Sequence, residues 1–166
     1  KYVYLIATFQ NPQGFTITHS RREAILKVTH RHGVPILEDD CYADNRYDGA
    51  PVTSLYNLDD QDSVMYVGSF SKIIAPGMSL GYMTAPDEVL NRAMTVKSGR
   101  VSEFTAMAVE KYARKYLDAH IEEINVIQRG KRDAMLSALG ENFGTSAEWS
   151  DPDGGLYIWM KEKEGA

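Results

Sequence analysis

Val34-Pro35-Ile36-Leu37-Glu38-Asp39-Asp40-Cys41-Tyr42 is an apolar run that ends abruptly in three acids, which is typical of a buried strand. Residues 2–9, rich in aromatic and β-branched side chains, predict an earlier strand. Apolar residues recur at helical spacing between the two, after a capping box at Ser20 and Glu23 and before a terminating Gly33. A strand-helix-strand unit of this kind has parallel strands and a right-handed crossover, so we expect an α/β fold.

The rest of the chain continues the sheet and then becomes helical. We expect two more strands, over residues 64–67 and 80–85. The connection between them and the first unit, residues 43–63, is long enough to be functional or to contain a short helix. The later elements that we expect are helices over about 87–98, 103–117 and 119–139 and a last strand over 155–160.

Bulk properties exclude several classes of protein. The chain has 166 residues, enough for one ordinary domain with a core, and a formal net charge of −5, which argues against a nucleic-acid or anionic-membrane binder. Its one cysteine, Cys41, cannot form an internal disulfide, which fits a reducing, cytoplasmic location. No apolar run approaches the roughly 20 residues that span a bilayer. The chain lacks an initiator Met and both ends look cut, so we expect part of a longer protein.

Polar residues follow three of the predicted strands directly. Asn11 follows the first, Asp39 and Tyr42 the second, and Ser69 to Lys72 the third. If these strands are parallel, their carboxyl ends share one edge of the sheet, where open α/β folds bind ligands. We therefore expect these residues to converge on one site.

Lys72 is the strongest candidate for a catalytic group. A lysine in a Ser-Phe-Ser-Lys turn after a buried strand is partly desolvated, which favours the free amine needed for Schiff-base chemistry. Ser69 and Ser71 offer hydroxyls to a phosphate. Taken alone, a Ser-x-Ser-Lys run favours a surface lysine, and the two serines are equally well described as turn-forming residues.

Asp39 emerges from a buried strand, and a carboxylate there needs a cation, a metal or several donors. A protonated pyridine nitrogen is one such cation. The same pattern occurs in the magnesium-binding strand of P-loop ATPases, but the chain contains no G-x-x-x-x-G-K-[ST] run. The remaining alternative is that residues 38–40 form a solvated strand end.

Tyr42 and Asn11 complete the expected site. Tyr42 lies three residues after Asp39, where its hydroxyl could reach an oxygen on a cofactor ring, and the Asn11 amide could donate to the same oxygen. Their alternatives are a packing aromatic and a turn residue. Amine, acid, phenol, amide and hydroxyls are the groups that pyridoxal 5′-phosphate (PLP) requires. No metal site is predicted, because His30 and His32 face different directions on a helix.

As a set, the motifs of this chain resemble those of the fold-type I, PLP-dependent class I and II aminotransferases. The resemblance is strongest with the branch that holds the 2-aminoadipate and kynurenine aminotransferases and the aminotransferase-like domains of MocR-type regulators. It covers residues 2–159, almost the whole chain. The matching motifs are Gln10–Gly14 (QNPQG), Glu38–Tyr42 (EDDCY), Gly68–Lys72 (GSFSK), Ala75–Met78 with Leu80–Tyr82, and Gly154–Trp159 (GGLYIW).

The resemblance implies a PLP-transferase fold of type I, with a mostly parallel sheet flanked by helices. Residues 1–117 would be part of the large PLP-binding domain and residues 118–166 the beginning of the small domain. Lys72 would be the Schiff-base lysine and proton shuttle, Asp39 the partner of the pyridine nitrogen, and Asn11 and Tyr42 the partners of the ring oxygen.

The implied activity is the transfer of an amino group between an amino acid and a 2-oxo acid, in a homodimer. The alternative is an effector domain of a MocR-type regulator, whose DNA-binding part would lie before residue 1, so that this segment contacts no nucleic acid. Ser69 and Ser71 would lie beside the cofactor phosphate. The phosphate-binding turn, the aromatic residue stacked on the ring and the arginine for the substrate carboxylate would lie outside these 166 residues, so we expect the chain alone to be inactive.

Ser79 departs from the family pattern. It stands where the family usually has an arginine that grips the cofactor phosphate. We therefore expect weaker cofactor binding rather than none.

Overall fold

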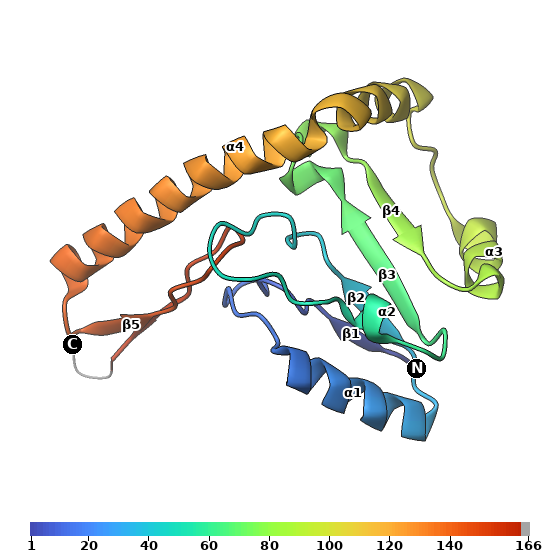
Figure 1. Ribbon diagram of the computed structural model, residues 1–166, viewed down its shortest axis with the longest axis horizontal. Helices are drawn as coiled ribbons and strands as arrows, with labels where there is room; N and C mark the ends of the chain where they lie inside the picture. The colour runs from blue at the N-terminus through green and yellow to red at the C-terminus, as the bar shows by residue number, and fades with distance from the viewer. Residues whose placement is uncertain (164–166) are drawn as a thin grey trace.

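The computed structural model describes residues 1–163 (Figure 1). Its strands are β1 (Val3–Leu5), β2 (Ile36–Asp39), β3 (Val64–Ser69), β4 (Gly81–Thr84), β5 (Ala147–Trp149) and β6 (Met160–Glu162). Its helices are α1 (His19–His32), α2 (Leu55–Leu58), α3 (Asp87–Val96) and α4 (Glu103–Phe143), with the short 3₁₀ turns η1 (Phe70–Lys72) and η2 (Pro76–Met78). None of the helices within residues 1–163 is long and apolar enough to cross a membrane.

The main sheet has the strand order β1-β2-β3-β4. Strands β1, β2 and β3 run parallel, in the register Val3–Ile36 and Ile36–Val64. Strand β4 pairs antiparallel with β3. The predicted parallel unit is confirmed, and the carboxyl ends of its three strands lie along one edge (Figure 1).

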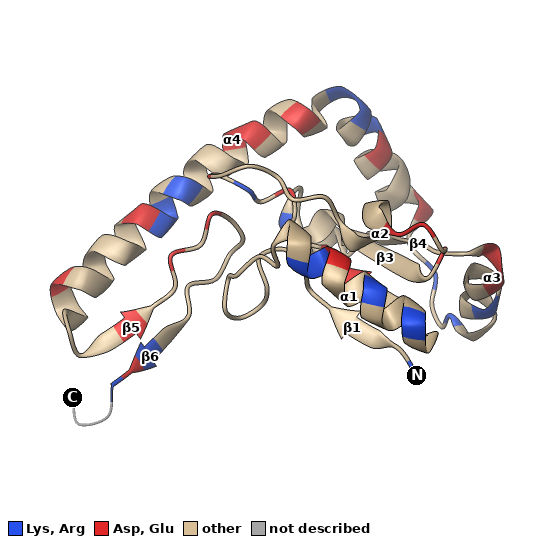
Figure 2. Cartoon of the chain, turned by 60° about the horizontal axis from the view of Figure 1, so that its bottom comes forward, with Lys and Arg blue, Asp and Glu red and all other residues tan. Residues whose placement is uncertain are grey.

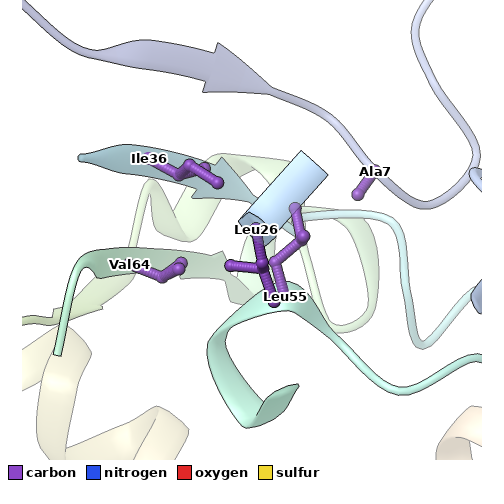
Figure 3. Packing of buried hydrophobic residues seen from close by; sticks show 5 residues of the cluster. All are labelled: Ala7, Leu26, Ile36, Leu55 and Val64. Atoms are coloured by element: carbon purple, nitrogen blue, oxygen red, sulfur yellow. The ribbon is translucent and has the colours of Figure 1, made fainter. Parts of the chain in front are cut away.

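The core lies between this sheet and the helices α1 and α2. The buried cluster consists of Ala7, which follows β1, Leu26 of α1, Ile36 of β2, Leu55 of α2 and Val64 of β3 (Figure 3). Burial of each large aliphatic side chain stabilises the fold by about 1.5–3 kcal/mol. Helix α2 lies inside the long connection between β2 and β3, so the short helix expected there is confirmed.

Helix α1 begins earlier than its predicted capping box. Its N-cap is Thr18, which makes no capping hydrogen bond with its side chain, and Ser20 already lies inside the helix. The capping box at Ser20 and Glu23 is therefore wrong. The end of α1 is confirmed, because Gly33 adopts φ 59° and its N–H donates to carbonyls of the last turn.

The two helices expected over 103–117 and 119–139 are one helix of 41 residues, α4. Neither Pro nor Gly lies between residues 103 and 129, so nothing in that part of the sequence stops the first helix. Val109 is the only buried residue of α4, and charges of both signs are spread along it (Figure 2). The expected strand over 155–160 is also wrong, because β6 begins at Met160 and pairs antiparallel with β5.

The Asp59 side chain links the start of β3 to the end of α1 by hydrogen bonds. Its carboxylate accepts hydrogen bonds from the N–H groups of Ser63 (2.6 Å) and Val64 (2.9 Å) and lies 2.8 Å from His30 Nε2. Burial raises the pKa of Asp59, but these donors and the N–H of Gln61 outweigh burial, and the pKa is lowered overall.

We therefore expect Asp59→Asn to destabilise the protein by about 1.5–3 kcal/mol at neutral pH. A lowered carboxyl pKa stabilises the fold above the unfolded value of about 4, and this contribution is lost as the pH falls through the folded pKa. The gap in thermal midpoint between wild type and variant should therefore narrow in acid. Asp60→Asn, at an exposed neighbour, is the control, and a gap that is independent of pH would contradict this role.

Candidate active site

The predicted site residues lie at the ends of β2 and β3 and in the turns that follow β1, β2 and β3. Asn11 lies in the turn after β1, Asp39 is the last residue of β2, and Tyr42 lies in the turn beyond it. Ser69 ends β3, and Lys72 is the last residue of η1. The parallel sheet therefore gathers these residues at one edge, as the sequence predicts.

Asn11 and Tyr42 are in direct contact. Asn11 Nδ2 lies 3.5 Å from the Tyr42 hydroxyl and 3.3 Å from the hydroxyl of Tyr157, and the two hydroxyls are 3.4 Å apart. The rings of Tyr42 and Tyr157 meet edge to face, with centroids 5.8 Å apart. Burial, followed by the contact with Tyr157, raises the pKa of Tyr42, which keeps its hydroxyl a proton donor. Tyr157 is a site residue that the sequence argument did not identify.

Asp39 is half-buried and accepts a hydrogen bond of 2.6 Å from the Tyr4 hydroxyl. Burial first, and then this bond, raises the pKa of Tyr4 to about 12. The neighbouring acids Glu38 and Asp40 are buried, so the alternative of a solvated strand end is wrong for both. Of the three acids, Asp39 is the one that stays accessible to a ligand.

Cys41 lies close enough to both Asp39 and Lys72 for each charge to act on its thiol. Burial is the main reason that the pKa of the Cys41 thiol rises to about 12; the Asp39 carboxylate also raises it, while the Lys72 ammonium lowers it. Both charges therefore act on the same thiol. A thiol with this pKa stays protonated at neutral pH, which fits a packing role and not that of a nucleophile.

The turn that carries Lys72 is fixed by side chains at both ends. Ser69 Oγ caps η1 by accepting from the Ser71 N–H at 3.2 Å, and Asn45 Nδ2 donates to the Lys72 carbonyl at 3.2 Å. Both serine residues are half-buried. Ser79 follows η2 at the left-handed φ of 46° and is exposed.

Gly154 and Gly155 bring Tyr157 to this edge from far along the chain. A Cβ at Gly154 would collide with the Phe9 ring and come within 2.5 Å of the Asn45 carbonyl oxygen. The Gly155 N–H donates to that same oxygen at 2.8 Å. Only a residue without a side chain allows so close an approach, so the glycine pair is what lets Tyr157 meet Asn11.

This arrangement of an amine, an acid and paired hydrogen-bond donors on a partly parallel sheet agrees with the comparisons. The family model "Aminotransferase class I and II" matches residues 2–164. The chain belongs to the class I and II aminotransferases. Its fold is confirmed as that of the PLP-dependent, fold-type I members, with a mixed sheet flanked by helices.

Relatives in this family include both enzymes and regulators. Aromatic-amino-acid aminotransferase 1 of Thermococcus litoralis is 36% identical over 99% of this chain and 40% of its own length. The HTH-type transcriptional regulator YisV of Bacillus subtilis is 30% identical over 95% of this chain and 34% of its own length. The chain thus spans about two fifths of the length of these relatives or less.

Solved structures of aminotransferases superpose closely on the chain. The kynurenine aminotransferase of Pyrococcus horikoshii matches with a TM-score of 0.91 and 35% identity, over 100% of this chain and 42% of that one. LysN, the α-aminoadipate aminotransferase of Thermus thermophilus, matches with a TM-score of 0.94 and 29% identity, over 99% and 44%. That LysN structure holds N-(5′-phosphopyridoxyl)-L-leucine.

Proposed function

We propose that the protein containing this chain is a PLP-dependent transaminase that moves an amino group between an amino acid and a 2-oxo acid. The observation that carries the proposal is the convergence of Lys72, Asp39 and the Asn11–Tyr42 pair on one sheet edge of a class I and II aminotransferase fold. The amino acid would leave its amine on the cofactor, and the 2-oxo acid would collect it.

The donor set at this edge fits PLP. When bound, PLP supplies an aldehyde and a protonated pyridine ring that withdraws electrons from the reacting carbon. We assign the accessible carboxylate of Asp39 to the ring nitrogen, where it holds the proton in place. Asn11 Nδ2 and the Tyr42 hydroxyl, already 3.5 Å apart, are two donors suited to one ring oxygen. Ser69 and Ser71 are assigned to the phosphate.

Lys72 has two tasks in this proposal. Its Nζ would be the nucleophile that holds the cofactor covalently. The same Nζ would act as general base and acid, taking a proton from one carbon of the substrate–cofactor unit and returning it to another. Both tasks need the amine held close to the cofactor, which is what the two fixed ends of its turn provide.

The proposal also covers the domain organisation, location and oligomeric state of the full-length protein. We infer that residues 1–117 belong to a large PLP-binding domain and that residues 118–166 begin a small domain, although α4 runs through residue 117 without a break. The proposed protein is a cytoplasmic homodimer in which residues outside this chain complete the site. The relatives, which are more than twice as long, support this view.

A second candidate function is an effector-sensing domain of a transcription regulator. It is supported by the regulators among the relatives, including NorG of Staphylococcus aureus at 29% identity over 96% of this chain. Such a protein would keep the cofactor site and bind DNA through a winged helix before residue 1.

Amino-group transfer by the full-length protein separates the two candidates. The protein is loaded with PLP and incubated with a mixture of amino acids and 2-oxoglutarate, and glutamate is measured. We expect PLP-dependent glutamate formation. Covalent PLP without glutamate formation, together with specific DNA binding, would favour the regulator.

Ser79 gives a prediction about cofactor affinity. We expect Ser79→Arg in the full-length protein to bind PLP roughly 10- to 100-fold more tightly, because a charge-assisted hydrogen bond to the phosphate contributes about 1.5–3 kcal/mol. Equilibrium dialysis or fluorescence titration measures the affinity, with Ser98→Arg at another exposed serine as control. Equal affinity in wild type and Ser79→Arg would show that residue 79 does not reach the phosphate.

A further inference from the structure

Asn45 is fully buried, at 0% exposure, three residues after Tyr42. Its side-chain Nδ2 lies 3.2 Å from the main-chain carbonyl oxygen of Lys72. A carbonyl oxygen only accepts hydrogen bonds, so the amide nitrogen of Asn45 must face it. The contact joins the turn after β2 to the lysine turn after β3.

The accepting carbonyl belongs to the last residue of η1. Carbonyls at the end of a helix have no partner within the helix and need one from elsewhere. The other end of η1 is capped by Ser69. Asn45 therefore supplies the second of two side-chain contacts that fix the direction in which Lys72 leaves the main chain.

The asparagine satisfies the Lys72 carbonyl but leaves one of its own polar atoms without a partner in the described part of the chain. Among residues 1–163, the Oδ1 atom of Asn45 is buried without a hydrogen-bond partner, which is unfavourable. Leucine has the same branched shape and no polar atoms to leave unpaired. What the amide adds over leucine is the hydrogen bond from Nδ2 to the Lys72 carbonyl oxygen.

The main chain of Asn45 makes two further hydrogen bonds to segments of the site. Its N–H donates to the Tyr42 carbonyl at 2.9 Å, and its carbonyl accepts from the Gly155 N–H at 2.8 Å. One buried residue thus contacts the segments that carry Tyr42, Lys72 and Tyr157.

We propose that Asn45 is a positioning residue for Lys72, which holds the lysine turn so that Nζ stays within reach of the cofactor. The inference rests on the proposed function, because it assigns Lys72 the role of covalent partner of PLP. Asn45 acts through the Lys72 main chain. Its effect on PLP binding should therefore disappear when the lysine amine is removed.

A double-mutant cycle in the full-length protein tests this dependence. PLP affinity is titrated by fluorescence for wild type, Asn45→Leu, Lys72→Ala and the double variant. We expect Asn45→Leu to weaken PLP binding roughly 2- to 10-fold when Lys72 is present, the range of one hydrogen bond, and to have no effect in the Lys72→Ala background. Asn91→Leu, on the exposed face of α3, is the matched control.

Equal weakening in both backgrounds would show a merely structural role and overturn the inference, as would no weakening in either. If Asn45→Leu does not fold, Asn45→Ala replaces it, because the smaller side chain fits the buried site and cannot donate to the carbonyl. Failure of the proposed function is a separate result: wild type would then form no borohydride-trapped adduct with PLP.

Discussion

We expect replacement of Lys72 with alanine in the full-length protein to abolish covalent attachment of PLP and to lower transamination at least about 100-fold. In its proposed role Lys72 is both the nucleophile and the general base, and a positioned acid or base alone contributes roughly 10²- to 10⁴-fold. The absorbance band of the lysine-linked cofactor and the borohydride-trapped peptide that contains Lys72 should both disappear. Noncovalent PLP binding should persist, because Asp39, Asn11 and Tyr42 remain.

Lys27→Ala removes an exposed lysine from α1 and should behave as wild type. A covalent PLP band that survives in Lys72→Ala would mean that another amine carries the cofactor. The assignment of the site to this sheet edge would then fail together with the role of Lys72.

Removing the buried charge of Arg22 should unfold the protein at a much lower temperature. Arg22 and Glu38 both have 0% side-chain exposure, and Arg22 Nη1 lies 3.6 Å from Glu38 Oε1. Glu38 also accepts from the N–H groups of Leu55 (3.0 Å) and Tyr56 (2.9 Å). The Arg22 guanidinium donates to four more oxygens, on Ile17, Thr53, Ala7 and Thr8.

We expect Arg22→Met to cost about 3–5 kcal/mol, because it leaves the Glu38 carboxylate buried without its cation. For a domain of this size that corresponds to a fall of roughly 6–20 °C in the thermal midpoint. Burial raises the pKa of Glu38. A carboxyl whose folded pKa exceeds its unfolded value binds protons more tightly when folded, so the variant should regain stability as the pH falls through that pKa.

Arg21→Met is the matched control, since Arg21 is the exposed neighbour on the same helix. Differential scanning calorimetry at several pH values measures all three proteins. If Arg22→Met melts within about 1 °C of Arg21→Met, the pair does not hold the sheet to α1 as its geometry indicates.

Local sequence patterns predicted the sheet edge because strand ends are marked by polar residues. Asp39 ends β2, and Tyr42 and Lys72 each lie three residues beyond their strands. Asn11 lies six residues after β1, which is shorter than the strand expected over residues 2–9. Parallel pairing of the three strands then brings these residues to one edge. Arg22 was not recognised as buried, because an arginine in a helix with a mixed pattern is normally assigned to the solvent face. Its burial depends on acceptors from four segments, which no local pattern reveals.

Tyr157 was missed for a related reason. It lies 146 residues from Asn11, and the contact exists because Gly154 packs against Phe9. The available signal was an aromatic residue two positions after a Gly-Gly turn, which identifies a partner only once the fold is known. The length of α4 was misjudged: helices were expected over 103–117 and 119–139, whereas one helix runs through both and most of its residues are exposed.

Helix α4 connects the main sheet to the hairpin formed by β5 and β6, and its 41 residues follow a curved path (Figure 2). Asn125 donates to the Asp44 carbonyl and Arg132 to the Asp48 carboxylate, so the helix is bound to the connection that follows Tyr42. The hairpin therefore reaches the sheet edge from two sides, through α4 and through the contact of Tyr157 with Asn11. A substitution that released α4 from Asp48 would be felt at Asn11, although the two residues lie in different turns.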